Sequence, residues 1–318
     1  MRVLIAVDGS KASGVVLQEA LARPWPQGTT FCLLTVVDPF FFTRAPLLLD
    51  EAREAARKFL AEAAKSFETA EWKTVVEVVL GNPRRAISTS AEEWRADLVL
   101  VGSQGLNALA RLALGSTVRS VLRHTKCSVE VVRASGRDTG SGERKKRILV
   151  ATDGSEFSEA ALKSIAERPW PAGTEVKVIS VPEFALWLGD FPYFRLEQVE
   201  ELNKSALDAA SAAVDLGKEI LSRAGLRVST NVPVEREAPA KTILDEAKKW
   251  DADLVVLGSH GRHGFDRLAL GSVSESIAMN AHSSVEVVRA LRSQEFEGKG
   301  EKIYESERSH DGHAVHVP

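Results

Sequence analysis

The sequence contains little cysteine and no long apolar run. Only two of its 318 residues are cysteines, Cys32 and Cys127, in separate segments of the first half. Neither belongs to a pair at metal-ligand spacing, so we expect two buried free thiols in a reducing compartment, by default the cytoplasm. No apolar stretch approaches the roughly 20 residues of a membrane-spanning helix. The composition therefore gives no sign of a membrane partner.

The chain also lacks an excess of charge of either sign. Its net charge is −3 and no segment is strongly basic, so a general nucleic-acid surface is not expected. The 44% hydrophobic and 27% charged content is typical of a soluble globular protein. A chain of 318 residues is long enough for about two ordinary domains.

What the chain does contain is an internal repeat. Residues 2–29 align without a gap to residues 147–174, and half of the aligned positions are identical. A second repeated segment, at 102–116 and 258–272, ends both times in the letters RLALGS. The copies are 145 residues apart in the first repeat and 156 in the second, so about eleven residues are inserted in the middle of the second half.

The repeats indicate two copies of one domain. We expect these domains to cover residues 1–134 and 147–290. Between them, residues 135–146 are rich in glycine, serine and charged residues, which is the composition of a flexible linker. Residues 291–318 are polar and show no clear period, so we expect a mostly disordered tail. Its three histidines could bind a metal, but histidines in such a tail are more often incidental.

Strand-like and helix-like patterns alternate within each copy. In the first, Val3–Val7 and Phe31–Val37 are continuous apolar runs, and Leu47–Phe67 has apolar residues at helical spacing. Apolar strands separated by helices are typical of a parallel sheet covered on both faces. We therefore predict an α/β fold of two tandem doubly wound domains, each a five-stranded parallel sheet flanked by helices. A ligand of such a domain lies beyond the carboxyl ends of the strands.

A glycine-rich loop follows the fourth expected strand of each copy, with the spacing G-x2-G-x9-G-S. Glycine permits positive φ and lets backbone N–H groups approach an anion. The last Gly-Ser opens a helix, whose N-terminus carries a partial positive charge. The loops therefore predict a site for a phosphate chain. The residues concerned are Gly102, Gly105, Gly115 and Ser116 in the first copy, and Gly258, Gly261, Gly271 and Ser272 in the second.

Two familiar phosphate-binding motifs do not match these loops. Neither copy contains G-x4-G-K-[ST], so the lysine of a P-loop is missing. No G-x-G-x-x-G follows the first strand, as a dinucleotide-binding fingerprint would require. We therefore expect a site that holds phosphate rather than one that transfers it.

Several residues of the predicted site also have structural explanations. Ser272 and Glu275 have the spacing of a capping box, and Ser116 could be an ordinary N-cap. Asp8 and Asp153, which end the first strand in D-G-S, could form an N-cap or an Asx-turn. In a doubly wound sheet, however, the first and fourth strands are neighbours. Each aspartate would then lie beside its own glycine loop, able to bind a ribose hydroxyl or a metal on phosphates.

Together these features resemble the universal stress protein family in its tandem two-domain form. The D-G-S after the first strand, the glycine loop, and the following helix and V-E-V-V-R strand all occur twice. The resemblance covers both copies and leaves the linker and tail outside. It implies an adenine-nucleotide alpha-hydrolase-like fold whose two domains pair through their last strands. Val129–Val132 and Val285–Val288 are the candidates for this pairing.

The resemblance also implies a ligand, which is ATP (or AMP or ADP), together with Mg²⁺. In nucleotide-binding members the glycine loop holds the phosphates and ribose, the aspartate lies by the nucleotide, and small apolar residues border the adenine. The residues implied in the first domain are Ala6, Asp8, Val36, Gly102, Gly105, Gly115, Ser116 and Thr117. Those implied in the second are Ala151, Asp153, Val181, Gly258, Gly261, Arg262, Gly271, Ser272 and Val273.

The two loops differ in charge. The second contains Arg262, His263 and Arg267, whereas the first contains only Arg111. Positive charge favours a triphosphate, so if one site is weak we expect it to be the first. These residues could equally be solvated loop residues.

Aromatic residues at 40–42 and 184–194 follow the second strand of each copy. Packing in a core or an interface is their more common role, and a lid over adenine is the alternative. Trp25 and Trp170 lie between prolines in matching loops, where we expect them to pin the turn before the second strand.

The sequence supports three functional hypotheses. The first is a cytoplasmic ATP- or AMP-binding stress protein, regulatory or protective, with its domains packed as a pseudo-dimer and a homodimer of chains as a further expectation. The second is a scaffold whose loops are structural and which acts through protein partners. The third is a slow ATP hydrolase. Against the third, no general base and no P-loop lysine is evident, so we assign no catalytic residue and no metal ligand.

Overall fold

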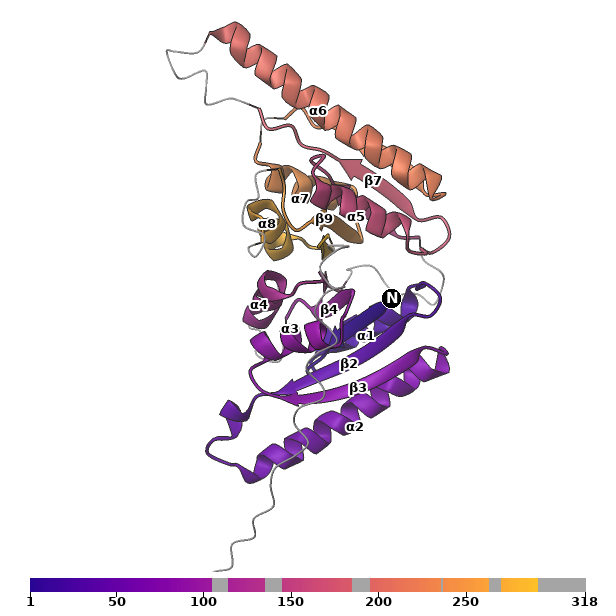
Figure 1. Ribbon diagram of the computed structural model, residues 1–318, viewed down its shortest axis with the longest axis vertical. Helices are drawn as coiled ribbons and strands as arrows, with labels where there is room; N and C mark the ends of the chain where they lie inside the picture. The colour runs from indigo at the N-terminus through magenta and orange to yellow at the C-terminus, as the bar shows by residue number, and fades with distance from the viewer. Residues whose placement is uncertain (105–113, 135–144, 185–194, 236, 263–269, 291–318) are drawn as a thin grey trace, which may run out of the picture.

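The computed structural model describes residues 1–104, 114–134, 145–184, 195–235, 237–262 and 270–290 (Figure 1). Strands and helices alternate through both halves, as the sequence predicts. The elements of the first half are β1 Arg2–Ala6, α1 Lys11–Ala22, β2 Thr30–Val37, the short helix η1 Pro39–Phe42, α2 Leu47–Thr69, β3 Lys73–Leu80, α3 Pro83–Glu93, β4 Leu98–Gly102, α4 Ser116–His124 and β5 Ser128–Val132. Those of the second are β6 Arg147–Ala151, α5 Glu156–Ala166, β7 Glu175–Ile179, α6 Leu196–Arg223, β8 Arg227–Asn231, α7 Pro239–Lys249, β9 Leu254–Gly258, α8 Ser272–Asn280 and β10 Ser284–Val288.

The strands form one 10-stranded sheet in the order β3-β2-β1-β4-β5-β10-β9-β6-β7-β8. Within each half the strands are parallel, and β1 pairs with β4 as β6 pairs with β9. The predicted doubly wound α/β fold is therefore confirmed. The halves meet where β5 and β10 pair antiparallel, with Glu130 opposite Glu286. The predicted pairing of the last strands is confirmed as well, and we call this junction the seam.

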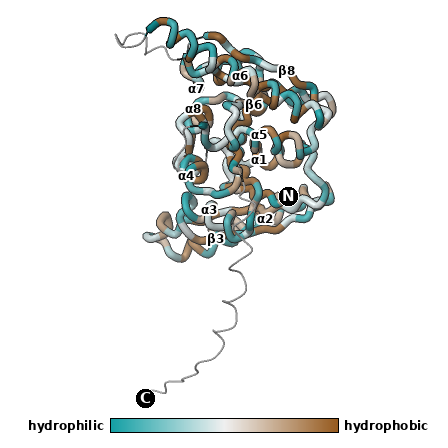
Figure 2. Tube along the Cα trace, turned by 45° about the horizontal axis from the view of Figure 1, so that its top comes forward, coloured by the Kyte–Doolittle hydropathy of each residue, from teal (hydrophilic) through white to brown (hydrophobic). Residues whose placement is uncertain are grey.

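The two faces of the sheet are covered differently. On one face, α3, α4, α7 and α8 pack over a single core that runs through both halves. On the other face, α1 and α2 cover one core, and α5 and α6 cover a second. Figure 2 shows α6 as alternating hydrophilic and hydrophobic segments, as expected for a helix with one buried face. Val129 and Val131 of β5 enter the common core. Glu130 lies between them in the strand and therefore faces the other side.

A buried ionic cluster fills the seam between the two separate cores. Arg23 Nη2 donates to both carboxylate oxygens of Glu130 at 2.7 Å. Arg168 Nη2 donates to both oxygens of Glu286 at 2.9 and 2.8 Å. None of the four residues is more than 9% exposed. An isolated charge would be very unfavourable at such a place, so each pair is stable only as a pair. The repeated R-P-W-P and V-E-V-V segments thus meet in space.

The tryptophans of the R-P-W-P segments lie against these arginines. The guanidinium carbons of Arg23 and Arg168 are 4.7 and 5.2 Å from the ring centroids of Trp25 and Trp170. Each indole N–H donates to a backbone carbonyl in the last turn of the preceding helix, at 2.7 and 2.9 Å. The tryptophans therefore anchor the turn that leads into the second strand of each half, as the sequence predicts.

The extra residues of the second half are spread over three places. The offset between equivalent elements rises from 145 residues to 149 where the long helix begins, to 154 where it ends, and to 156 at α7. Helix α6 accordingly has 28 residues where α2 has 23. All three places follow β7 or β8 in the chain, and these are the two strands of this half farthest from the seam in the sheet.

Cys32 and Cys127 are both buried and neither forms a disulfide, as predicted. Burial raises the pKa of each thiol to about 12. Among the helices within the described ranges, none combines the length and the apolar character that crossing a bilayer requires.

Candidate functional site

In each half the aspartate and the glycine loop come together at the carboxyl ends of the strands, because β1 is paired with β4 and β6 with β9. Since the halves pair antiparallel, the two sites lie at opposite edges of the sheet. In the second half the contact is direct. The backbone N–H of Arg262 donates to Asp153 Oδ2 at 2.9 Å, and the N–H of Ser155 donates to Oδ1 at 3.0 Å. Asp153 therefore forms the Asx-turn considered above and also ties the end of β6 to the loop.

The surroundings of Asp153 favour its ionised form. Burial by itself would raise the pKa of this carboxyl group. The hydrogen bonds from Ser155 and from the N–H of Arg262 outweigh burial and hold the pKa below its usual value. The site thus keeps a carboxylate at neutral pH. Such a group can accept a hydrogen bond from a ligand hydroxyl or share a cation with phosphates.

Both glycine loops are closed at the base in the same way. The N–H of Gly115 donates to the carbonyl of Ser103 at 3.0 Å, and that of Gly271 to the carbonyl of Ser259 at 2.9 Å. Helices α4 and α8 begin at the next residue, and no side chain of the described residues caps either helix. Their first N–H groups therefore point out of an uncapped helix end, which is the arrangement that binds an anion.

The capping explanations for the two serines are wrong. Gly271 is the N-cap of α8, so Ser272 is its first helical residue and the Ser272–Glu275 capping box does not form. Glu275 instead accepts a hydrogen bond from an arginine of α4 across the seam. Ser116 is likewise the first residue of α4, and its hydroxyl accepts a hydrogen bond from Arg84 Nη2 at 2.9 Å.

Positive φ does not explain the glycines in the described parts of the loops. Positive φ occurs instead at Gly9 and Gly154 of the D-G-S turns, at 78° and 79°. None of the loop glycines that the structure describes uses the positive φ that glycine permits. These are Gly102, Gly115, Gly258, Gly261 and Gly271.

Close packing explains the glycines of the second loop better. A Cβ on Gly258 would lie 2.6 Å from the carbonyl carbon of Phe157 in α5. One on Gly261 would lie 2.7 Å from Oδ2 of Asp153, and one on Gly271 would lie 3.1 Å from a carbonyl oxygen of the loop itself. Glycine at these positions therefore lets α5 and the carboxylate approach the loop.

A buried histidine that sequence analysis missed lies beside the second loop. His260 is 7% exposed, its ring centroid is 5.1 Å from that of Phe157, and its Nδ1 is 3.0 Å from Ser259 Oγ. Its Nε2 is buried without a hydrogen-bond partner among the described residues. An unpaired buried polar atom is unfavourable, so a partner for this nitrogen would stabilise the site. The sequence feature that could have indicated His260 is its position between Gly258 and Gly261 of the repeated glycine spacing.

The first site lacks the phenylalanine and the histidine of the second, and its aspartate is more exposed. Ala12 and Gln104 stand where the second half has the phenylalanine and histidine. Asp8 is exposed, and its Oδ1 accepts hydrogen bonds from Ser10 N–H at 3.0 Å and Ser13 Oγ at 2.8 Å. The Asx-turn is therefore present in this half too.

The residues expected to border adenine lie along the common core. Ala151 is part of that core, and Ala6, Val36, Val181 and Val273 are partly buried against it. All of them lie on the face covered by α3, α4, α7 and α8. The structure thus brings together the apolar residues, the aspartate and the helix end of each half.

Part of each loop lies outside the described residues. Gly105 and Arg111 of the first loop, and His263 and Arg267 of the second, are in this part. Of the charged residues by which the two loops differ, Arg262 alone lies within the described residues. The linker at 135–144, the aromatic residues at 185–194 and the tail at 291–318 also lie outside them, whereas Thr117 is described and partly exposed.

The aromatic residues after β2 do not pack in the core. Phe40 and Phe41 are 75% and 70% exposed, and their rings contact each other with centroids 6.1 Å apart. The core role considered from the sequence is therefore wrong for this pair.

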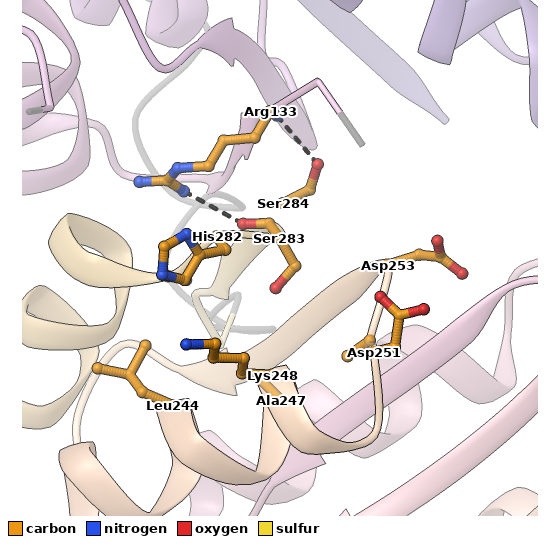
Figure 3. A pocket seen from close by; sticks show the side chains of 11 residues that line it. Arg133, Leu244, Ala247, Lys248, Asp251, Asp253, His282, Ser283 and Ser284 are labelled. Carbon is orange, nitrogen blue, oxygen red and sulfur yellow. Dashed lines mark hydrogen bonds between the residues drawn. The ribbon is translucent and has the colours of Figure 1, made fainter. Parts of the chain in front are cut away.

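A cavity of about 140 Å³ lies near the seam, at the amino ends of β9 and β10 (Figure 3). Because β5 runs antiparallel to β10, this is also the edge of the first glycine loop, whose Ser103 N–H donates to the carbonyl of Val132 at 3.1 Å. Arg133, on its wall, crosses the seam and donates from Nη2 to the carbonyl of Ala278 in α8 at 2.6 Å. Arg289 makes the equivalent bond to the carbonyl of Leu122 in α4 at 2.9 Å. Burial lowers the pKa of Arg133 to about 10. Each arginine thus caps a helix of the other half, and the cavity belongs to the seam.

The fold and site define a tandem α/β protein with an uncapped helix end beside an aspartate in each half. The model of the Universal stress protein family matches residues 1–133 and 145–289. The chain therefore belongs to the universal stress protein family. A universal stress protein of Mycolicibacterium smegmatis is 30% identical over 301 residues, which cover 90% of this chain and 96% of that protein.

Solved structures agree on the fold. A universal stress protein from Archaeoglobus fulgidus superposes with a TM-score of 0.62 and 23% identity, covering 92% of this chain and 97% of that chain. This similarity concerns the fold alone. A universal stress protein in complex with cAMP has 27% identity and a TM-score of 0.32, covering 42% of this chain and 96% of that chain.

Proposed function

We propose that this universal stress protein binds ATP, or AMP or ADP, at its glycine loops and acts as a nucleotide-dependent regulatory or protective protein. One observation carries the proposal. In the second half the carboxylate of Asp153 accepts the N–H of Arg262 in the loop, beside the uncapped N-terminus of α8. An uncapped helix end can accept an anion and a carboxylate can accept a hydroxyl group, so this combination supports the binding of a ribose phosphate.

The roles of the residues follow from their chemistry. The N–H groups of Ser272 and Val273 at the start of α8 would hold phosphate, and Asp153 would accept a ribose hydroxyl. The partly buried Val181 and the buried Ala151 would border the adenine. His260 Nε2, buried without a partner among the described residues, would complete its hydrogen bonding through the nucleotide. In the first half the same roles would fall to the equivalent residues, which are Ala6, Asp8, Val36, Ser116 and Thr117.

Mg²⁺ would accompany ATP in this proposal. The described residues contain no group of three or more histidine, cysteine, aspartate or glutamate side chains that could hold a metal. The phosphates would therefore supply most of the ligands, with Asp153 as a neighbouring carboxylate.

The test is to denature the purified protein, identify any released nucleotide by chromatography, and titrate the nucleotide-free protein with Mg-ATP by calorimetry. Two nucleotides per chain support both sites, and one supports the second site. Asp153→Ala and Gly261→Val should abolish binding at the second site. Asp8→Ala is the matched variant that should leave that site unchanged. A valine at 261 would displace the Asp153 carboxylate, since even a Cβ there lies 2.7 Å from Oδ2.

The same experiment separates the alternatives. No released nucleotide and no heat from Mg-ATP would overturn the proposal and favour a scaffold that acts through protein partners. ATP turnover that survives purification and is lost in Asp153→Ala would add slow hydrolysis to binding.

We also propose the cytoplasm as the location, supported by the two buried thiols that form no disulfide. The domain limits of 1–134 and 147–290 remain a prediction.

For a homodimer, the best-suited described surface is the open edge of β3. Residues 76–79 read V-E-V-V, the same letters as 129–132 and 285–288, which pair with each other at the seam. β3 is one of the two outermost strands of the sheet, and Val76 is 45% exposed. An exposed, long, apolar edge favours pairing with another strand. Val76→Lys should reduce the sedimentation coefficient to that of a monomer, whereas Thr230→Lys, at an exposed position of β8, should not.

A further inference from the structure

Arg133 and Arg289 occupy equivalent places at the ends of the two seam strands. Arg133 directly follows β5, as Arg289 directly follows β10. The backbone N–H of Arg133 donates to Ser284 Oγ at 3.1 Å (Figure 3), and that of Arg289 donates to Ser128 Oγ at 3.2 Å. Both arginines are thus anchored across the seam by their main chains as well as by their side chains.

Each guanidinium group reaches a helix that begins at the glycine loop of the other half. The acceptor of Arg133 Nη2 is Ala278, in the last turn of α8, and that of Arg289 Nη2 is Leu122, in the last turn of α4. Both helices have only nine residues, and an isolated helix of that length is unstable in water. Contacts at the two ends therefore decide how well each helix is ordered. A cationic donor at the carboxyl end is favourable, because it binds one of the last carbonyls and complements the helix dipole.

The main chain beside each arginine supports the glycine loop of its own half. The N–H of Ser103 donates to the carbonyl of Val132 at 3.1 Å, and the N–H of Ser259 donates to the carbonyl of Val288 at 2.9 Å. A change of the arginine side chain leaves these main-chain bonds in place. The contribution of each guanidinium group to the other half can therefore be tested separately from the support of its own loop.

We propose that Arg289 positions the first candidate site and Arg133 the second, so that each site is completed by a residue of the other half. The inference rests on the function proposed above, because the helices concerned are those whose uncapped N-termini would hold phosphate. Ala278 lies six residues, or about 9 Å, beyond the start of α8 at Ser272. Arg133 therefore acts on the second site through the helix, as a positioning residue. Burial lowers its pKa only to about 10, so it is charged at neutral pH.

The test is calorimetric titration of full-length chains that keep one site each with Mg-ATP. Asp153→Ala leaves the first site and Asp8→Ala leaves the second. In the chain that keeps the second site, Arg133→Met should weaken binding about three- to tenfold, and Arg289→Met should leave it unchanged. In the chain that keeps the first site, the two effects should be exchanged. Lysine in place of the effective arginine should restore part of the affinity, since it keeps a cationic donor.

Arg147→Met is the matched control. Arg147 Nη1 donates to the carbonyl of Trp250 at the carboxyl end of α7, at 3.3 Å, and α7 does not begin at a glycine loop. This variant should bind Mg-ATP like the parent at either site. The proposal is overturned if Arg133→Met weakens both sites equally, weakens the first alone, or weakens neither.

Hydrogen exchange of the nucleotide-free chain gives a readout that does not depend on nucleotide binding. The amides of α8 should exchange faster in Arg133→Met and those of α4 in Arg289→Met, each with the other helix unchanged. Equal acceleration of both helices would show a general loosening of the seam and would contradict positioning. The crossed pattern in a parent chain that binds no Mg-ATP would refute the function proposed above and still support the positioning of the two helices.

Discussion

Glu130 and Glu286 lie opposite each other in the pairing of β5 with β10, and each is neutralised by an arginine of its own half. Two carboxylates at facing positions would repel each other, so the seam forms only with Arg23 and Arg168 in place. On the opposite face, valines of the same strands join the common core. The seam is thus apolar on one side and ionic on the other.

Glu130→Gln should lower the free energy of unfolding by about 3 kcal/mol, because it breaks a buried ion pair and leaves the Arg23 guanidinium only the longer contact with Glu19, at 3.9 Å. Urea unfolding at pH 7 measures this. Glu62→Gln, in the exposed pair with Lys65, should change it by less than about 0.5 kcal/mol. The double variant Arg23→Met/Glu130→Leu should be more stable than Glu130→Gln alone. A Glu130→Gln protein as stable as the parent would show that the ion pair contributes nothing to the seam.

Gly258→Ala should destabilise the fold by about 1–3 kcal/mol, since the added Cβ would lie 2.6 Å from the backbone of Phe157 and force α5 away from β9. Gly115→Ala is the contrasting variant. Its nearest neighbour would be 3.7 Å away, so its stability should stay close to that of the parent. Chemical unfolding of the two proteins compares them, and equal effects would contradict the packing explanation.

Asp153 should contribute to stability in a pH-dependent way. Its pKa in the folded protein is below its usual value, because the hydrogen bonds outweigh burial. Its contribution is therefore complete above the unfolded pKa of about 3.9 and is lost as the pH falls through the folded pKa. Asp153→Asn should thus be less stable than the parent at pH 7, and the difference should shrink below about pH 4. Urea unfolding at pH 7, 5 and 3 measures it, and a gap that widened in acid would have the wrong sign.

The two cysteines should be unreactive in the native protein. Burial raises the pKa of each thiol to about 12, so on the order of one molecule in ten thousand carries a thiolate at pH 8. A thiol reagent such as Ellman's should label neither cysteine before unfolding and both in denaturant. Rapid labelling of a native thiol would show that its segment opens to solvent.

The fold could be predicted from the sequence because its signals are local and occur twice. The apolar run Val3–Val7 and the alternation of strands with helices specify a doubly wound domain without reference to distant residues. The pairing of the last strands came from the family resemblance. Its physical basis, the contact of Arg23 with Glu130, joins residues 107 positions apart and has no signature in a single segment. Only the repetition of R-P-W-P and V-E-V-V hinted that both mattered.

The candidate site was predicted less completely. The sequence indicated Asp153 and the loop, but spacing alone suggested a capping box at Ser272 that is absent, since the helix already starts from Gly271 as its N-cap. Helix ends are the least certain part of a sequence-based assignment. His260 was missed because its burial depends on Phe157, a residue of another element.

The shared sheet has a consequence for synthesis on the ribosome. β5 ends at residue 132, but its partner β10 is complete only at residue 288. At roughly 5–20 residues per second, that interval lasts about 8–30 s. Throughout it, the newly made first half carries an unpaired inner strand and an apolar face with no second half to cover them. Every nascent chain therefore passes through a stage in which the future centre of the molecule is an open sheet edge, which could pair with another strand.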